Sequence, residues 1–583
     1  MVEVNKLTWK IGGEAGYGIM STGLMFSKAA ARAGLYVYDY AEYPSLIRGG
    51  HNVYHVRVEQ EEIFSQIRLV DVLVALNEET VNLHINEIVQ GGALIYDGDA
   101  VPIDLSKLRK DIIYISVPLV KIAREIGKDP IMRNTVALGA SFGLVDFDFE
   151  IVRGVIEDAF KGKDKETIDV NINTAKAGYD FVKSKNISFK NKLQKVKAPL
   201  KMVVTGNEAL GMGAIKAGMK FFSAYPMTPI SSLLHFFSAY QNEYSFVVKQ
   251  PEDEISAINM AIGAGFAGAR AMCATSGGGF CLMVEGVGLA TQSETPVVIV
   301  EGMRGGPSTG LPTWTDQSDL RFIIHSSQGE ALKIVLAAGD HEDCFYLAAD
   351  AFNYADRYQM PVILITDKHL AEGHKSVERF DQNKIRIDRG FIVTEKDAQS
   401  INDYRRYKFT ENGISPRAFP GLSKNTMFLA GSDEHDEYGS FDEEADNRRK
   451  MMEKRAKKFA LATLEIKNKT RIFGPDKAEV TIISWGSTKA MIREAMKWLS
   501  KEGISINFIQ IVCINPFPTN EIKDILSKSK KVLIIETARY GQLLSLIKEH
   551  TLMDIKERLF KYDGRPFYPE EIYDKIKEMI KNS

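Results

Sequence analysis

The feature that most constrains the fold of this chain is a repeated alternation of short apolar strands with segments of helical pattern. The alternation occurs three times within the 583 residues. It begins with LTWKIGG at residues 7–13, recurs from MVVTG at 202–206 and returns with EVTIISWGS at 479–487. Strands that are separated by helices run parallel, because each helix returns the chain to the same edge of the sheet. The sequence therefore predicts an α/β protein with three α/β domains and mainly parallel sheets.

Two polar segments separate these three units. Residues 187–200 are basic and polar and carry too little apolar surface to fold alone, so we interpret them as a linker. Residues 376–470 are charged and irregular, which is typical of a solvated loop that leads into a helix. The predicted divisions are a first domain at 1–186, the linker, a second domain at 201–375, the charged connecting segment, and a third domain at 471–583.

Composition argues against several classes of function. A formal net charge of -2 gives no electrostatic reason to expect nucleic acid or an anionic membrane as a partner. No apolar stretch is long enough to cross a bilayer, and the first residues lack the hydrophobic segment of a signal peptide, so we expect a cytoplasmic protein. Four cysteines form no CxxC pair, which argues against a zinc site or a cysteine-ligated iron–sulfur cluster in this chain; they are Cys273, Cys281, Cys344 and Cys513. The sequence thus predicts no metal ligands of its own.

A glycine-rich loop, GGEAGYGIMSTG, joins the first predicted strand to the first helix. In it, Gly13, Gly16 and Gly18 would let backbone N–H groups approach a phosphate. The spacing matches neither G-x-G-x-x-G nor the lysine-bearing P-loop, so a phosphate site and a packing turn both stay open. Arg48, next to two glycines in IRGGHN, is a second candidate for an anion contact. Asp39 lies near the position of a ribose-binding acid, which keeps a nicotinamide cofactor as an alternative.

The second unit contains a threonine between two prolines, in AYPMTPISS. Pro226 and Pro229 restrict the backbone on either side of Thr228. One interpretation is a helix start, with Thr228 as the N-cap and Pro229 at the first helical position. The other is that a helix N-terminus holds N–H groups and a hydroxyl against an anionic ligand. The local pattern alone favours the first interpretation.

Three acidic residues begin the next helix of this unit, in QPEDEISAINMAIGAGFAG. Glu252, Asp253 and Glu254 all suit the first turn, where acids stabilise the positive end of the helix dipole. The helix itself is rich in alanine and glycine, so another backbone must pack close to it. The strand after it ends in TSGGG, again a place for close approach of a ligand or a backbone. A carboxylate at this position could activate a cofactor at a subunit interface.

Taken together, these segments resemble the alpha subunit of the 2-oxoacid:ferredoxin oxidoreductases, in the form with a gamma domain fused at its N-terminus. YPMTPIS resembles the family's Tyr-Pro-Ile-Thr-Pro signature, and EDEISAINMAIGAGFAGARAMCATSGGGFCLM and GGPSTGLPT are similar to its pyrimidine-binding domain. GISPRAFPG, DEHDEYG and ETARYGQL resemble its later motifs, and GGEAGYGI with IRGG resembles its gamma domain. The resemblance covers nearly the whole chain and implies a gamma-type domain, a pyrimidine-binding domain and a transketolase C-terminal-like domain, in that order.

The resemblance implies coenzyme A-dependent oxidative decarboxylation of a 2-oxoacid to acyl-CoA and CO₂, with reduction of ferredoxin, through thiamine diphosphate. Glu254 would bond N1′ of the aminopyrimidine and so favour the imino form that deprotonates the thiazolium carbon. Thr228 would lie near that carbon and the substrate, with Tyr225 and Pro226 beside the cofactor. The glycine loop and Arg48 would contact coenzyme A.

The chain lacks the Gly-Asp-Gly and downstream Asn that hold the metal and diphosphate of thiamine cofactors; YDGDAV is the nearest string. The resemblance implies that a separate beta subunit supplies the diphosphate site, Mg²⁺ and the [4Fe–4S] ligands. This chain would then be half of an active site, with the beta subunit, ferredoxin, the 2-oxoacid and coenzyme A as partners. Whether two alpha–beta pairs associate stays open.

One position departs from the family pattern. Members that act on 2-oxoglutarate or on many 2-oxoacids often carry a basic residue after GLPT, and here that residue is Trp314. Arg304 or Arg321 would be the substitute cation, whereas Trp314 itself would suit a bulky or apolar substrate. Two alternatives from other classes also remain: a nicotinamide-dependent dehydrogenase that uses the glycine loop, and a non-catalytic subunit that docks ferredoxin or a beta-type partner.

Overall fold

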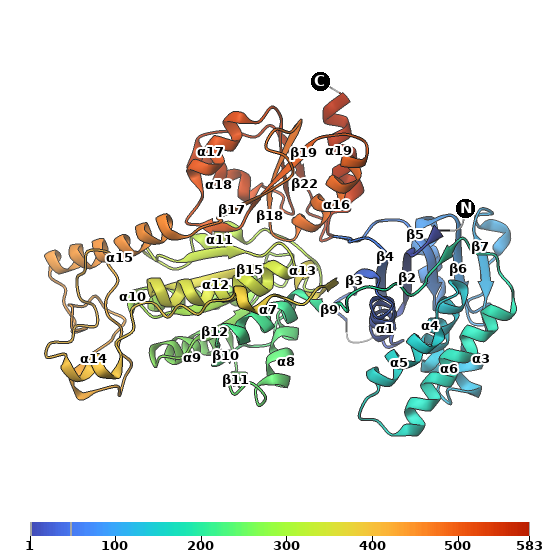
Figure 1. The fold of residues 1–583 in the computed structure, drawn as a ribbon, viewed down its shortest axis with the longest axis horizontal. Coiled ribbons are helices and arrows are strands. Elements are labelled where there is room, and N and C mark those ends of the chain that lie inside the picture. Colours follow the sequence, from blue (N-terminus) through green and yellow to red (C-terminus); the bar gives the residue numbers. More distant parts are fainter. Residues whose placement is uncertain (1–2, 47–48, 582–583) are drawn as a thin grey trace. The chain divides into compact units, whose positions relative to one another are not determined.

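The computed structural model describes residues 3–46 and 49–581, whose helices and strands are drawn in Figure 1. The chain divides into two compact units, and each combines segments that are distant in the sequence. The first contains residues up to 205 with 373–379 and 568–574, and the second contains 206–372, 380–567 and the residues from 575 onward.

The first unit is built on an eight-stranded sheet of order β7-β6-β5-β2-β4-β3-β16-β9. Its strands are β2 (Lys6–Glu14), β3 (Tyr36–Glu42), β4 (His51–Glu59), β5 (Val70–Ala75), β6 (Ile88–Tyr96), β7 (Ile113–Ser116), β9 (Met202–Thr205) and β16 (His374–Val377). The strands β2, β5, β6 and β7 are parallel, as the sequence pattern predicts. The pattern missed β4, which pairs antiparallel with both β2 and β3. This half of the sheet is therefore antiparallel.

Helices pack on this sheet through aromatic and glycine contacts. The helices that form the core are α1 (Ile19–Arg32), α4 (Arg133–Leu144), α5 (Phe149–Ala159) and α6 (Lys165–Ser184). Trp9 of β2 stacks on Phe26 of α1, with ring centroids 4.5 Å apart. Gly139 lets α4 approach α6, because a Cβ atom there would lie 1.8 Å from the carbonyl oxygen of Ala175. The small residues of α4 thus set how closely the two helices pack.

The segment predicted as a linker contributes to the first unit. Residues Asn191–Lys192 form β8, which pairs in parallel with β1 (Glu3–Val4). Phe189 and Leu193 are fully buried in the core of this unit. These two apolar side chains anchor a stretch whose average composition is polar, which explains why composition alone predicted a free linker.

The second unit contains a seven-stranded sheet of order β11-β10-β12-β13-β15-β14-β20. Its strands are β10 (Phe221–Ser223), β11 (Val247–Lys249), β12 (Ala271–Thr275), β13 (Val297–Met303), β14 (Ile334–Ala337), β15 (Pro361–Asp367) and β20 (Cys513–Asn515). All of these strands except β20 are parallel. The helices that matter for the site are α8 (Ser231–Tyr240), α9 (Glu254–Phe266), α10 (Gly277–Gln292) and α11 (Leu320–Ile324).

The same unit contains a five-stranded sheet of order β17-β19-β18-β21-β22. Its strands are β17 (Thr470–Phe473), β18 (Val480–Trp485), β19 (Ile506–Ile511), β21 (Val532–Glu536) and β22 (Glu557–Phe560). Its apolar core is continuous with that of the seven-stranded sheet, and β20 extends that sheet by pairing with β14. The second and third predicted domains therefore pack as one body.

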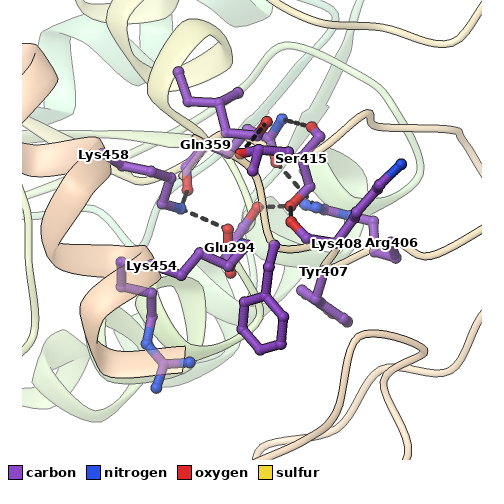
Figure 2. Close-up of polar contacts among 12 residues, drawn as sticks. Glu294, Gln359, Arg406, Tyr407, Lys408, Ser415, Lys454 and Lys458 are labelled. Atoms are coloured by element: carbon purple, nitrogen blue, oxygen red, sulfur yellow. Dashed lines mark hydrogen bonds and ion pairs between the residues drawn. The ribbon is translucent and has the colours of Figure 1, made fainter. Parts of the chain in front are cut away.

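The charged connecting segment is anchored by buried ion pairs, as Figure 2 shows. Lys454 and Lys458 of α15 (Ala445–Glu465) bind the two carboxylate oxygens of Glu294 at 2.5 and 2.7 Å, and all three side chains are buried. Arg406 donates to the backbone oxygen of Glu294 and to the side chain of Gln359. Burial alone would raise the pKa of Glu294, but the two ammonium groups lower it; burial lowers the pKa of Lys458 to about 7. Some cations of this otherwise largely exposed segment, among them Arg406, Lys454 and Lys458, are therefore internal.

Candidate active site

A cavity of about 490 Å³ lies at the carboxyl ends of the parallel strands in the second unit. Its walls come from the loop after β10, the start of α10 and the loop after β13. Ligands of open parallel sheets bind at this edge, because the strand ends and helix starts converge there. The lining includes Met227, Gly277, Gly278, Cys281, Arg304, Gly305, Ser308 and Asp319.

Thr228 lies in the loop between β10 and α8 and does not cap that helix. The helix begins at Ser231, with Ile230 in the N-cap position, and the N–H groups of both residues donate to the backbone oxygen of Met227. The interpretation of Thr228 as an N-cap is therefore wrong. Thr228 is half-buried, and its hydroxyl makes no hydrogen bond within residues 3–46 and 49–581. The peptide bond to Pro229 is cis.

Glu254 is the first residue of α9 and is 3% exposed. Asp253 carries the cap, because its side chain accepts the N–H of Ser256 at 2.7 Å. The Oε1 atom of Glu254 is buried and has no hydrogen-bond partner in the described parts of the chain. Burial raises the pKa of this carboxyl, and Arg304 partly offsets the effect. Glu254 is thus an acid available to a ligand rather than a capping residue.

Gly279 of α10 makes room for this carboxylate. A Cβ atom at this position would lie 2.4 Å from Oε1 of Glu254 and 2.1 Å from Oγ1 of Thr275. Real Cβ atoms do not approach other atoms so closely, so any side chain would displace Glu254 or the end of β12. The TSGGG sequence therefore serves close packing around the acid.

Arg304, directly after β13, connects the threonine loop to the acids of the cavity. Its Nη1 donates to the backbone oxygen of Thr228 at 2.9 Å. Burial lowers the pKa of its guanidinium, whereas the carboxyl groups of Asp319, Glu254 and Glu301 raise it. Arg304 is the predicted cation that the structure brings to the cavity.

The other predicted substrate contacts lie elsewhere. Arg321 donates to Glu549 at 2.8 Å and to Ser545 at 3.1 Å, both on α18 (Gln542–Thr551), and is not part of the cavity lining. Trp314 lies in the loop between β13 and α11 but is not part of the cavity lining, and its backbone oxygen accepts the N–H of Gly305 at 3.2 Å. Tyr225 and Pro226 are exposed in the loop that contains Thr228.

Three side chains at or beside the site were missed by the sequence analysis. The guanidinium of Arg565 stacks on the Trp314 ring, 3.2 Å from its centre. Glu301 and Asp319 are acids in or beside the cavity. Glu301 could have been found from the sequence, because it is an ionisable residue inside the apolar strand VVIVEGM. No local sequence pattern indicated Arg565.

In the first unit, some glycines of the loop between β2 and α1 are packed against neighbouring residues, whereas Gly16 has no neighbour where a side chain would be. Gly16 and Gly18 have positive φ angles of 94° and 71°. A Cβ atom on Gly18 would lie 2.1 Å from Nδ2 of Asn134, whereas one on Gly16 would meet no atom within 4 Å. Gly18 therefore serves packing, and Gly16 leaves room for a ligand. A Cβ on Gly13 would be in tight contact with Leu76 at 3.0 Å.

Two further predicted residues belong to this unit. Asp39 is fully buried, and its carboxylate binds the hydroxyl of Ser27 at 2.5 Å and the His374 ring at 2.8 Å. These partners occupy the carboxylate that a ribose would need, which weighs against the dehydrogenase alternative. Arg48 lies outside the described residues.

The buried acid, the glycine helix start and the adjacent arginine at parallel strand ends define an α/β enzyme subunit with a ligand cavity. In the described part of the chain, no helix combines the length and apolar character needed to cross a membrane. The sequence matches three family models. They are "Pyruvate ferredoxin/flavodoxin oxidoreductase" at residues 8–181, "Pyruvate flavodoxin/ferredoxin oxidoreductase, thiamine diP-bdg" at 212–454 and "Pyruvate:ferredoxin oxidoreductase core domain II" at 478–572.

Relatives of similar length match almost the whole chain. The 2-oxoacid:ferredoxin oxidoreductase subunit alpha of Sulfolobus sp. is 35% identical over 99% of this chain and 97% of its own length. The 2-oxoacid:ferredoxin oxidoreductase 2, subunit alpha, of Aeropyrum pernix is 35% identical over 100% of this chain and 98% of its own length. The structure of the 2-oxoglutarate:ferredoxin oxidoreductase from Magnetococcus marinus is 33% identical, with a TM-score of 0.90 over 99% of this chain and 100% of that one. The chain belongs to the alpha subunits of the 2-oxoacid:ferredoxin oxidoreductase family.

Proposed function

We propose that this chain is the alpha subunit of an enzyme that converts a 2-oxoacid and coenzyme A to acyl-CoA and CO₂ and reduces ferredoxin, with thiamine diphosphate as cofactor. The observation that carries the proposal is the buried, unpartnered Oε1 atom of Glu254 beside the cavity. Gly279 lets α10 pack closely on this carboxyl without displacing it, because any side chain there would meet Oε1. The relative from Magnetococcus marinus, solved with 2-oxoglutarate, coenzyme A and succinyl-CoA bound, supports the same substrate classes.

When bound, thiamine diphosphate supplies a carbon nucleophile and an electron sink for decarboxylation. Glu254 would hold a proton at Oε1 and donate it to the aminopyrimidine ring, which its raised pKa favours. Arg304 and the N–H groups at the start of α10 would bind the substrate carboxylate, because both present positive charge to the cavity. Thr228 would orient the substrate through its free hydroxyl, with Tyr225 and Pro226 beside the cofactor.

Trp314 and Arg565 together bear on the choice of 2-oxoacid. Arg565 brings a cation against the ring of Trp314, and among the described residues its hydrogen bonds reach only the neighbouring Asp563. We infer that this guanidinium attracts the distal carboxylate of a dicarboxylic 2-oxoacid. Arg321 forms an ion pair with Glu549 and would therefore fix the position of α18 rather than bind the substrate.

The beta subunit would cover the exposed apolar side chains of α9 and α10. Ile255, which follows Glu254, and Leu282 are each 47% exposed, and Met260 is 41% exposed. Ile255 and Leu282 also line a groove of about 390 Å³. Large apolar side chains gathered beside a catalytic acid are typical of a surface that binds another protein. The beta subunit would bring the diphosphate site, Mg²⁺ and the [4Fe–4S] cluster.

We also propose that residues 1–186 are a gamma-type domain, 201–375 a pyrimidine-binding domain and 471–583 a transketolase C-terminal-like domain. Coenzyme A would bind at the loop of Gly13, Gly16 and Gly18 with Arg48. In the assembled enzyme, Arg48→Gln should raise KM for coenzyme A about tenfold and leave KM for the 2-oxoacid unchanged, as expected for the loss of one charged contact. An unchanged KM for coenzyme A would exclude Arg48 from this site.

The proposal is tested on the complex co-expressed with its beta subunit. The wild type should reduce ferredoxin or methyl viologen only when both a 2-oxoacid and coenzyme A are present. Glu254→Ala should assemble normally and lose most turnover, because the ring contact is removed. Full activity in this variant would reject the role of Glu254. The two alternatives predict other outcomes: NAD(H) binding by the full chain for a dehydrogenase, and turnover insensitive to every substitution from 225 to 254 for a docking subunit.

A further inference from the structure

The inference concerns Gln317, a buried residue of the loop that joins β13 to α11, and it rests on the proposed function. We propose that Gln317 is a positioning residue for the 2-oxoacid: it fixes the wall of the cavity to the five-stranded sheet. The strands of that sheet contribute no residue to the described lining of the cavity. The five-stranded sheet thereby controls the shape of a cavity that its own strands do not form.

The loop that contains Gln317 supplies much of the cavity wall. Residues 304–309, at the start of the loop, all line the cavity. The backbone oxygen of Gly305 accepts the N–H of Leu311 at 2.7 Å, and the N–H of Gly305 donates to the oxygen of Trp314 at 3.2 Å. These two bonds connect the lining residues to the later part of the loop. A displacement at Gln317 is therefore transmitted to the cavity wall.

Gln317 is bound through both its backbone and its side chain to the ends of strands from two sheets. Its backbone N–H donates to the oxygen of Thr537, directly after β21, at 2.8 Å, and its Oε1 accepts the N–H of Thr537 at 3.2 Å. Its Nε2 donates to Oδ2 of Asp367, the last residue of β15, at 3.3 Å. The same nitrogen donates to the backbone oxygen of Trp485, the last residue of β18, at 3.4 Å. One residue thus joins the carboxyl ends of three strands.

The amide of Gln317 is held in a single orientation. A glutamine amide has an acceptor oxygen and two N–H donors, and here the oxygen and both donors are used. The side chain is 1% exposed, so another orientation would leave a buried polar atom unpaired, at a cost of about 1–3 kcal/mol. An apolar side chain of the same size would fill the space but could not direct the loop in this way. The contact therefore specifies a position and does more than fill the interior.

Gly486, directly after β18, gives access to this contact from the side of the five-stranded sheet. It is not part of the described lining of the cavity, and a Cβ atom there would lie 2.5 Å from Nε2 of Gln317. Because Nε2 is the end of a flexible side chain, Gly486→Ala should fold with the amide displaced and its bonds to Asp367 and Trp485 lost. The variant thus disturbs Gln317 without changing any residue of the cavity.

The test is steady-state reduction of methyl viologen by the alpha–beta complex, with assembly checked by size-exclusion chromatography. In Gly486→Ala, KM for the 2-oxoacid should rise about tenfold, because a displacement of about 1 Å at groups that position a substrate can cost up to about 100-fold. KM for coenzyme A should change less. A purely structural role of Gln317 predicts lower stability with both KM values unchanged in the assembled enzyme.

The matched control is Gly503→Ala, between α16 (Thr488–Lys501) and β19. Gly486 and Gly503 both have positive φ angles, of 63° and 78°, so alanine strains the backbone at each position. A Cβ atom on Gly503 would meet no described atom within 4 Å, so this variant carries the strain without the contact to Gln317. Gly503→Ala should therefore keep the KM of the wild type. Equal KM values for the 2-oxoacid in the two variants overturn the inference.

Gln317→Met approaches the same contact from the loop, because it keeps the length of the side chain and removes the amide. It should also raise KM for the 2-oxoacid about tenfold, and a wild-type KM in this variant overturns the inference. Gly486→Ala should add little in the Gln317→Met background, since both act on one contact, whereas fully additive effects overturn the inference. A wild-type complex without activity toward any 2-oxoacid would instead reject the proposed function.

Discussion

Substituting Gly279 by alanine separates the position of Glu254 from its chemistry, because the carboxyl group is retained and only the space that it occupies is reduced. The new methyl group would lie 2.4 Å from Oε1 of Glu254 and 2.1 Å from Oγ1 of Thr275. An ordinary contact needs about 3.4 Å or more, so the carboxyl or the helix must shift by about 1 Å. A misplacement of this size at a catalytic group costs about 100-fold in rate, or about 2.7 kcal/mol.

The effect of Gly279→Ala on turnover should therefore exceed its effect on stability. Alanine gains about 1 kcal/mol of helix propensity over glycine, which offsets part of the steric cost of about 1–3 kcal/mol. The assay is steady-state reduction of methyl viologen by the alpha–beta complex, with kcat and KM measured separately and assembly checked by size-exclusion chromatography. We expect kcat to fall about 100-fold, with the complex intact.

The matched control is the same substitution one residue earlier. A Cβ atom on Gly278 would meet only the carbonyl oxygen of Ser308, at 3.9 Å. Because Gly278 lines the cavity, the extra methyl group should affect KM more than kcat. Equal kcat values in the Gly279→Ala and Gly278→Ala enzymes would refute the argument that the glycine serves the position of Glu254.

Three further predictions address other parts of the molecule. Glu294→Gln leaves Lys454 and Lys458 buried without a counter-charge, so the free energy of unfolding, measured by urea titration, should fall by about 3–5 kcal/mol. The control is Lys128→Ala, which breaks an exposed pair with Glu166 and should change this free energy by less than about 1 kcal/mol. Similar losses in the two variants would contradict the anchoring role of the network in Figure 2. Thr228→Ala should lower kcat about tenfold and leave cofactor affinity unchanged, because one hydrogen bond is lost in the rate-limiting step. A variant with the kcat of the wild type would exclude Thr228 from the reaction. Arg565→Gln should raise KM for 2-oxoglutarate about tenfold more than KM for pyruvate, and a parallel change for both would show that Arg565 does not read the second carboxylate.

The fold was largely predictable because its signal is periodic. Alternating strands and helices give the same pattern wherever they occur, and they correctly predicted parallel strands such as β2, β5, β12 and β13. The sharing of one core by the last two predicted domains was not predictable in this way. It depends on β20, three residues that pair with β14 from a distance of more than 170 positions. No local pattern carries that information.

The site was predictable only where chemistry and spacing coincide within one segment. Thr228 and Glu254 lie in motifs with unusual local composition, and Arg304 lies directly after an apolar strand. The sequence could not predict that Asp253 rather than Glu254 carries the helix cap, because both acids suit the first turn. Nor could it reveal Arg565, which meets Trp314 from a segment about 250 residues later. Such pairs are set by tertiary packing.

The unsatisfied polar atoms of the second unit provide a separate argument for the location of the site. Buried polar atoms in folded proteins nearly always have a hydrogen-bond partner, so each exception requires a reason. In the described part of the chain, such exceptions occur in both units, and some belong to residues beside the cavity: Oε1 of Glu254 and both carboxyl oxygens of Glu301, which face Arg304, and Oγ of Ser276, which precedes Gly277 of the lining. A protein under selection for stability alone would fill these positions with apolar side chains, because an unpartnered buried group costs about 1–3 kcal/mol. The unpartnered oxygens of Glu254 and Glu301, which face Arg304, indicate that the fold keeps polar atoms free for a ligand, so ligand binding should stabilise this unit.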